Sequence, residues 1–278
     1  MYVKREKDRK HENEKKDNRM GKTIAIVNQK GGVGKTTTAV NLAAAVGMKG
    51  YKTLLVDIDP QGNATSGLGF NKRETQKSTY DMMIGTATAE EIVKETKFSH
   101  LDLLPANMDL AGAELEIADL DSREARIKNA LASLKEKYDF IFLDCPPSLG
   151  LITINALCAV DSVLVPIQCE FYALEGLSQL MNTVRQVKRK YNPLIDIEGV
   201  LLTMFDGRLN LTQQVVSEVK RFFPQKVFSV VIPRNVRLSE APSFGQPVSY
   251  YDKSSKGSKA YDDLADEFLR KNGKVPLA

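Results

Sequence analysis

The sequence contains the run Asn28-Gln29-Lys30-Gly31-Gly32-Val33-Gly34-Lys35-Thr36-Thr37, which joins an apolar stretch at 23–27 to an apolar, helix-like stretch at 38–48. The first stretch is short and β-branched, which favours a strand, and the second is typical of a buried helix. A strand, a glycine-rich loop and a helix in this order predict a loop that binds phosphate groups. The chain around it should therefore be an α/β nucleotide-binding fold.

The residue types of this run suit that chemistry. We expect its three glycines to let the backbone curl through positive φ values and approach a ligand closely; they are Gly31, Gly32 and Gly34. Together with Val33 and Thr37, they offer backbone N–H groups at the start of a helix, where anions bind. Lys35 adds a positive charge for the β- and γ-phosphates, and the hydroxyl of Thr36 is an expected Mg²⁺ ligand.

The spacing departs from the general pattern G-x-x-x-x-G-K-[ST], because Gln29 occupies the position of the first glycine and Lys30 follows it. In this form the loop resembles the deviant Walker A motif of the ParA/MinD ATPases, to which nitrogenase iron protein is related. The resemblance implies that Lys30 is a signature lysine, which reaches across a dimer to the nucleotide of the partner subunit.

Composition restricts the class of protein. The chain has 278 residues, 42% of them hydrophobic, and it has neither a run of about 18 apolar residues nor an apolar N-terminal signal region. Three widely spaced cysteines argue against a disulfide framework, so we expect a cytoplasmic protein. Residues 1–19 carry +3 of the net charge of +4. We expect them to be a disordered extension, followed by one ATPase domain at 20–272 and a tail at 273–278.

A second signature follows the predicted strand at 52–58. That strand brings Asp57 and Asp59 to its C-terminal end, and the run from Leu55 to Asn63 resembles the corresponding run of ParA/Soj proteins. The resemblance implies that Asp59 positions the attacking water and that Asp57 lies near the metal and the loop. The alternative is that both carboxylates merely cap the next segment.

A third signature is the apolar strand at 140–144, which ends in Asp144. A buried strand ending in Asp is the Walker B arrangement, so Asp144 is expected to hold Mg²⁺ through water. The neighbouring Cys145 is expected to pack in the core.

The C-terminal half is predicted to contain strands at 161–167, 195–204 and 226–232, a long helix at 171–189 and a terminal helix at 258–269. The run from Pro233 to Pro242 again resembles ParA/Soj proteins, which implies that the ends of the last two strands border the nucleotide; the residues are Met204, Pro233, Arg234 and Asn235. Repeated strand–helix alternation predicts one doubly wound, mostly parallel sheet with helices on both faces.

The resemblance implies an ATPase with slow intrinsic turnover, in which ATP and Mg²⁺ hold a homodimer together. Its catalytic residues would be Lys30, Lys35 and Asp59. Implied partners are non-specific double-stranded DNA on the nucleoid, a ParB-type protein that stimulates hydrolysis and, by analogy, a replication initiator. Candidate DNA contacts are basic residues of the C-terminal half, although each is equally consistent with an ordinary solvated charge; they are Arg208, Lys220, Arg221, Arg234 and Arg237.

Two other functions fit the sequence less well. A MinD-like membrane switch needs a basic amphipathic helix at the C-terminus, but the last helix carries four acidic residues, which an anionic leaflet would repel. No membrane partner is therefore expected. An iron–sulfur carrier needs cysteines at a spacing that this sequence lacks.

Overall fold

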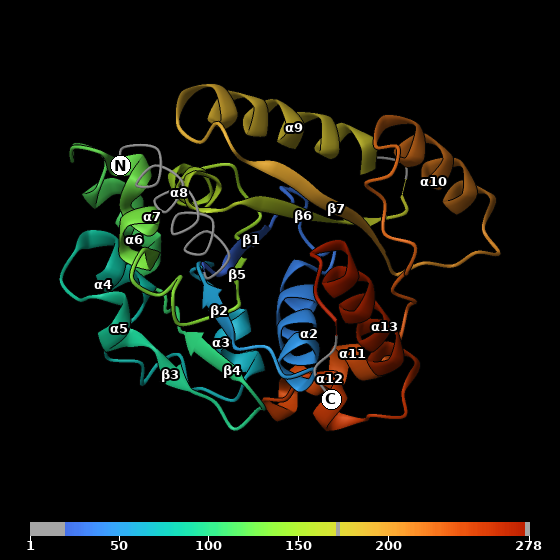
Figure 1. Cartoon of the computed structure of the whole chain (residues 1–278), viewed down its shortest axis with the longest axis horizontal. Coiled ribbons are helices and arrows are strands. Elements are labelled where there is room, and N and C mark those ends of the chain that lie inside the picture. The colour runs from blue at the N-terminus through green and yellow to red at the C-terminus, as the bar shows by residue number, and fades with distance from the viewer. Residues whose placement is uncertain (1–19, 171–172, 276–278) are drawn as a thin grey trace, which may run out of the picture.

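The computed structural model describes residues 20–170 and 173–275. It contains a seven-stranded sheet with the order β3-β4-β2-β5-β1-β6-β7, shown in Figure 1. The strands are β1 (Lys22–Ile26), β2 (Thr53–Asp57), β3 (Lys94–Glu95), β4 (Leu101–Leu104), β5 (Phe140–Asp144), β6 (Ser162–Gln168) and β7 (Asp196–Thr203). All pairings are parallel except that of β3 with β4, so the predicted fold class is confirmed.

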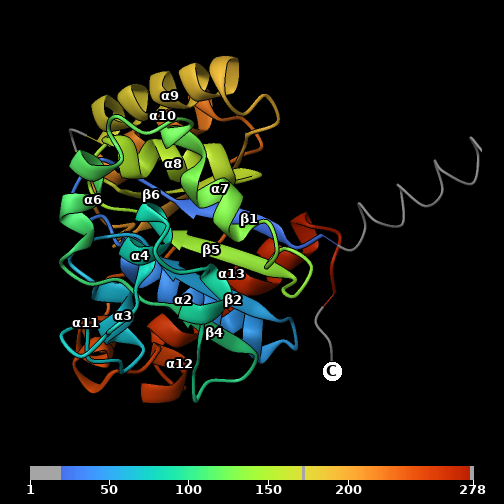
Figure 2. The same ribbon diagram turned by 90° about the vertical axis from the view of Figure 1, so that its left-hand side faces the viewer.

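Helices cover both faces of the sheet (Figure 2). One apolar core lies under α4 (Thr79–Ile84), α5 (Ala89–Ile92), α6 (Leu110–Glu116), α7 (Arg126–Leu131), α8 (Leu151–Ala159), α9 (Ala173–Lys190) and α10 (Asn210–Phe222). The other lies under α2 (Lys35–Met48), α3 (Asn63–Gly67), α11 (Val236–Glu240), α12 (Val248–Tyr251) and α13 (Lys256–Lys271). The central strands face a core on each side, which explains why they read as continuous apolar runs.

The sheet brings the sequence signatures to one edge. β1 and β2 both pair with β5, and the register places Asp144 next to Ile26 on one side and Asp57 on the other. The loop that follows β1 therefore begins beside both carboxylates. Ligands of open α/β sheets bind at this carboxyl edge of the strands.

The segment at 226–232 is not a strand, so that prediction was wrong. It runs beside β7 and makes isolated bridges at Val227 and Pro233, but the ladder is interrupted between them. The N–H groups of Ser229 and Val230 donate instead to the carboxylate of Glu267 on α13, over 2.9 and 3.0 Å. A carboxylate from a distant helix thus takes the place of β7 at these two residues, while Phe228 N and Ile232 N on either side still donate to carbonyl oxygens of β7.

The apolar residues at 122–136 have helical spacing and predict one continuous helix, and this prediction is wrong in its extent. It consists of a 3₁₀ turn at Arg123–Ala125, then α7, which ends at Leu131 and is followed by turns. The side chain of Asn155 donates to Arg123 O over 2.7 Å and accepts from Ile127 N over 3.4 Å. These are the two backbone groups that a continuous helix would pair with each other, so Asn155 interrupts the helix.

The predictions for the two ends of the chain fall partly outside the residues that the structure describes. The expected extension at 1–19, the first two residues of the predicted helix at 171–189 and the last three residues of the tail lie outside the described residues. Val275, within the predicted tail, accepts a hydrogen bond from Tyr51 Oη over 2.5 Å. Among the described residues, no helix is both long and apolar enough to cross a bilayer.

Candidate nucleotide-binding site

The glycine-rich loop forms an open backbone cradle at the start of α2. Gly32 has φ 75° and Gly34, the residue before the helix, has φ 87°, both in the left-handed region. Gly31 does not adopt a positive φ, so that part of the expectation was wrong. A Cβ atom built on Gly31 or Gly32 would meet no atom within 4 Å. The first turn of α2 contains no acidic residue and has no side-chain cap, so its N–H groups are available to an anion.

Lys35 lies inside this cradle, with only 7% of its surface exposed. Its Nζ donates a hydrogen bond to Lys30 O over 3.0 Å. Burial lowers the pKa of Lys35, and the charge of Asp144 opposes that effect. A buried ammonium group whose one hydrogen-bond partner within the described ranges is a carbonyl oxygen favours an anionic ligand in its vicinity.

The two strand-end carboxylates are both fully buried, but their partners differ. Asp57 accepts hydrogen bonds from the N–H of Asp59 and from both the N–H and the hydroxyl of Thr65, over 2.7–3.1 Å. Neither oxygen of Asp144 has a hydrogen-bond partner among the described residues. Burial raises the pKa of Asp144 and the nearby Asp57 raises it further, while the Thr36 hydroxyl lowers it.

Asp144 therefore fits a bound cation. A buried, unpartnered carboxylate beside a threonine hydroxyl supplies the hard oxygen ligands that Mg²⁺ prefers. No group of three or more His, Cys, Asp or Glu side chains could hold a metal ion in the part of the chain that is described.

Asp59 begins the loop that leads to α3 and is 6% exposed. One of its carboxylate oxygens accepts from Gln61 N over 2.9 Å. The same loop is fixed at its other end, because the hydroxyl of Thr65 donates to Asp57 and accepts from Ala106 N over 2.9 Å. Asp59 is thus held beside the cradle, while its action on water stays a prediction.

A cavity of about 240 Å³ adjoins the cradle beyond the end of β7. It is lined by all four residues that the resemblance assigned to the nucleotide, together with part of the loop; they include Met204, Pro233, Arg234, Asn235, Gly34 and Thr37. Met204 has φ 48°, a conformation that is uncommon and costs energy for a non-glycine residue. The neighbouring Thr203 hydroxyl donates to Val33 O over 2.8 Å and ties β7 to the loop.

Lys30, the expected signature lysine, forms an ion pair within its own chain. Its Nζ lies 2.7 Å from Glu170 Oε2, just after β6. Glu170, Thr65 and Thr203 were missed as site residues by the sequence reasoning. Thr203 lies at the end of the predicted strand at 195–204 and Glu170 follows the predicted strand at 161–167, and these positions at the ligand-binding edge were the available signal.

The candidate DNA contacts are dispersed. The side chain of Arg208 is 90% exposed and pairs with Asp206, whose pKa is lowered to about 2 by the hydrogen bonds from Arg208. Lys220 and Arg221 lie at the far end of α10, about 15 Å along the helix axis from its first residue, Asn210. Arg234 lines the cavity, and Arg237 on α11 pairs with Glu240 and Asp252. The structure therefore does not gather all five into one patch.

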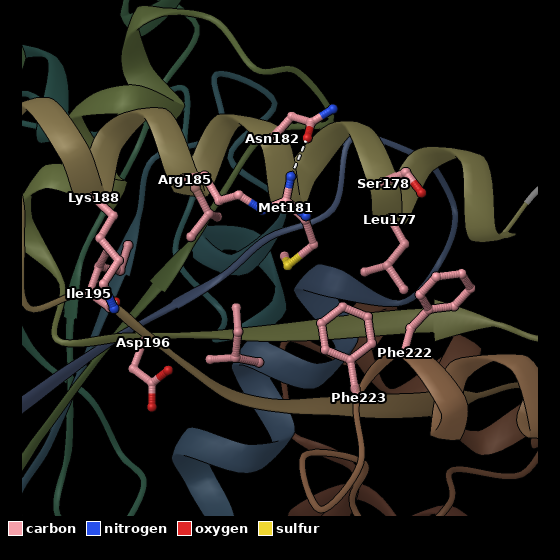
Figure 3. A pocket seen from close by; sticks show the side chains of 12 residues that line it. Leu177, Ser178, Met181, Asn182, Arg185, Lys188, Ile195, Asp196, Phe222 and Phe223 are labelled. Atoms are coloured by element: carbon pink, nitrogen blue, oxygen red, sulfur yellow. Dashed lines mark hydrogen bonds between the residues drawn. The ribbon is translucent and has the colours of Figure 1, made fainter.

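A separate groove of about 360 Å³ lies between α9, α10 and the start of β7 (Figure 3). Its walls are mainly apolar, with Leu177 and Met181 on one side and Phe222 and Phe223 on the other. None of the residues that sequence reasoning assigned to a site lines this groove.

Comparisons with known proteins agree with this geometry. Residues 21–197 match a family model described as an AAA domain. The chain is 59% identical to the sporulation initiation inhibitor protein Soj of Bacillus subtilis over 89% of its length and 98% of that protein, and 52% identical to the chromosome partitioning protein ParA of Myxococcus xanthus over 91% and 89%. It resembles a crystal structure described as cobyrinic acid a,c-diamide synthase of Mycobacterium smegmatis with bound ADP and magnesium, with a TM-score of 0.80, 37% identity and coverage of 93% and 99%.

Proposed function

Because the chain belongs to the Soj/ParA family of chromosome-partitioning ATPases, we propose that it acts as a dimer that ATP assembles and hydrolysis releases. ATP occupies the glycine-rich cradle, with its phosphates on the N–H groups of residues 31–37 and its adenine in the cavity bordered by Met204 and Pro233. Support comes from the two left-handed glycines, the buried Lys35 and the continuity of cradle and cavity at Gly34 and Thr37.

Mg²⁺ would be held by the Thr36 hydroxyl and Asp144, with Asp57 beside them. When bound, it supplies positive charge that offsets the β- and γ-phosphates. The chain itself prepares this position, because Asp144 is buried with no internal partner and Asp57 raises its pKa further. Three hydrogen bonds to Asp57 fix the loop that carries Asp59.

Hydrolysis then needs positioning and charge stabilisation more than covalent chemistry. A water oriented by Asp59 attacks the γ-phosphorus, the bond to the bridging oxygen of ADP breaks, and inorganic phosphate leaves. Lys35 in the same subunit and Lys30 from the partner subunit neutralise the developing charge. A lysine supplied across the interface makes turnover depend on dimer formation and therefore slow in dilute protein.

The ATP-bound dimer binds DNA non-specifically through basic side chains of the C-terminal half, with Arg208 as the foremost candidate because it is the most exposed of the paired arginines. Two subunits double the phosphate contacts and steepen the dependence on salt. A ParB-type protein stimulates hydrolysis, and association with the nucleoid and with a replication initiator follows from the same switch.

The observation that carries the proposal is the unpartnered, buried carboxylate of Asp144 beside a glycine cradle. The test is retention of the protein on DNA with ATP, with ADP and without nucleotide. Wild type and a control, Lys94→Ala on the exposed edge strand β3, should be retained only with ATP, and Lys35→Ala should not be retained. Equal retention in all three states would refute the switch.

No described contact favours the membrane-associated alternative. The apolar residues of α13 that would have to enter a bilayer, Leu264, Phe268 and Leu269, are fully buried against the sheet and α2. Co-sedimentation with anionic vesicles in the presence of ATP should therefore fail.

A further inference from the structure

Lys30 is held at three points inside its own subunit. Its Nζ pairs with Glu170 over 2.7 Å, its N–H donates to Asn28 Oδ1 over 3.0 Å, and its carbonyl oxygen accepts from Lys35 Nζ over 3.0 Å. Each tie engages a different group of the same residue. The conformation of Lys30 is therefore determined by its own chain before any partner is present.

The two preceding residues, Asn28 and Gln29, attach the same loop to β6 and α9. Asn28 Nδ2 donates to Pro166 O on β6 over 2.8 Å, and Gln29 Nε2 donates to Gln179 Oε1 on α9 over 2.7 Å. Asn28 is 3% exposed, so its bond is shielded from water. Residues 28–30 thus lie against the segment from β6 to α9, which also carries Glu170.

This arrangement conflicts with the role proposed for Lys30 in the dimer. An ammonium group 2.7 Å from a carboxylate of its own chain cannot also neutralise the phosphates of the partner subunit. A carboxylate that followed Lys30 to those phosphates would be repelled by them. The ion pair must open before Lys30 can act across the interface.

We propose that Glu170 is an intramolecular latch that withholds Lys30 from the partner subunit and so opposes dimer assembly. This inference rests on the proposed function, in which Lys30 acts across the dimer. Lys35 connects the latch to the nucleotide, because phosphates in the cradle draw its ammonium group away from Lys30 O. ATP binding then breaks the hydrogen bond from Lys35 Nζ to Lys30 O, and the phosphates of the partner's nucleotide compete with Glu170 for Lys30 Nζ.

The ion pair between Lys30 and Glu170 contributes little free energy, because the two side chains are 33% and 47% exposed. Removing one exposed pair shifts an equilibrium by about 1.4- to 5-fold, and a dimer contains two. In an Asp59→Ala background, which blocks hydrolysis, Glu170→Gln should lower the Kd of the ATP-dependent dimer by about 2- to 30-fold, as measured by sedimentation equilibrium.

Two control comparisons test whether the change in Kd arises from loss of the Lys30–Glu170 ion pair. Asp196→Asn, which removes the similarly exposed 2.8 Å pair with Lys226, should leave the Kd unchanged. Glu170→Gln should also have no effect once Lys30 is replaced by Ala. An unchanged or higher Kd for Glu170→Gln would overturn the latch, and a higher value would instead make Glu170 a dimer contact.

A measurement on the nucleotide-free monomer separates this inference from the proposed function. Acylation of Lys30 by a water-soluble reagent, followed by mass spectrometry, should rise about 1.4- to 5-fold in Glu170→Gln and not in Asp196→Asn. If that rise occurs while Asp59→Ala fails to dimerise with ATP, the ion pair exists but the switch is wrong. If dimerisation occurs without the rise, only the latch fails.

Discussion

Asp57 and Asp144 lie directly opposite each other on the neighbouring parallel strands β2 and β5, and both are fully buried. Two carboxylates in this position repel each other until a cation joins them, and burial adds to the cost. Asp144→Asn should therefore raise the free energy of unfolding of the nucleotide-free protein by about 1–2 kcal/mol. It should also abolish the stabilisation by ATP with Mg²⁺ and lower ATPase activity about 100-fold. Urea unfolding with and without ligand, together with phosphate release, measures both, and a destabilised apo variant would contradict the assignment.

Thr65 should prove essential to the loop that carries Asp59. Thr65→Val removes the hydroxyl that donates to Asp57 and accepts from Ala106 N, and leaves that buried N–H without a partner. The expected loss is about 2–3 kcal/mol of unfolding free energy. Thr65→Ser keeps the hydroxyl and should lose less than half as much, so equal losses would mean that packing of the methyl group dominates.

Glu267 should control, from a distance, the wall of the cavity that we propose for adenine. Glu267→Ala removes the acceptor of Ser229 N, Ser229 Oγ and Val230 N, so we expect a loss of about 2–4 kcal/mol and faster amide exchange over residues 226–235. Weaker ATP binding should accompany it. Asp263→Ala, an exposed position on the same helix, is the control. Unchanged exchange in Glu267→Ala would refute the role of this carboxylate.

The Lys22–Glu198 contact should make stability depend on pH. Burial alone would raise the pKa of Glu198, but the charge of Lys22 and hydrogen bonds from Lys22, Ser162 and Asn272 lower it overall. A lowered carboxyl pKa stabilises the fold above the unfolded value of about 4.3, and the contribution is lost as pH falls through the folded pKa. Glu198→Gln should cost about 1–3 kcal/mol at pH 7 and progressively less below pH 4.3. Urea titrations at pH 7 and pH 3.5 compare the two proteins, and a constant gap would contradict the prediction.

Arg208 should contribute to DNA affinity through charge. Arg208→Glu should weaken ATP-dependent binding and reduce the slope of log K against log salt by about 0.9 for each DNA phosphate that a subunit no longer neutralises. Lys94→Glu, on the opposite edge strand, changes net charge equally and should leave the slope unchanged. Asp206→Asn should have the reverse effect of Arg208→Glu, because it releases the arginine from its ion pair. DNA binding that is unchanged in all three variants would exclude Arg208 as a DNA contact.

Local patterns predicted most of the fold. The apolar runs at 23–27, 52–58 and 140–144 mark strands buried on both faces, and their terminal carboxylates meet because parallel strands share an edge. The failures occur where a distant side chain takes over backbone hydrogen bonds. Glu267 interrupts the ladder at Ser229 and Val230, and Asn155 divides the helix near Ile127. No local window contains both partners of such a contact.

The residues of the candidate site also divide into those that local sequence identifies and those that depend on a distant partner. The glycine loop, Lys35 and Asp144 could be recognised because each belongs to a short run of neighbouring residues. The position of Glu170 after a predicted strand indicates only that it lies near the ligand-binding edge; its partner Lys30 is 140 positions away, and nothing in the sequence around Glu170 indicates which lysine it meets. Sequence also named Arg234 for two roles, and the structure places it on the cavity wall.

The last helix is joined to the cradle rather than appended to it. Tyr261 is fully enclosed and shares a hydrogen bond with Thr38 on α2 over 3.1 Å, while Tyr51 binds the chain again at Val275. A premature stop codon at or before position 261 would therefore remove Tyr261 from the wall of the cavity beside the cradle. Fluorescent fusions and purification handles placed at that end need a spacer long enough to leave the helix seated.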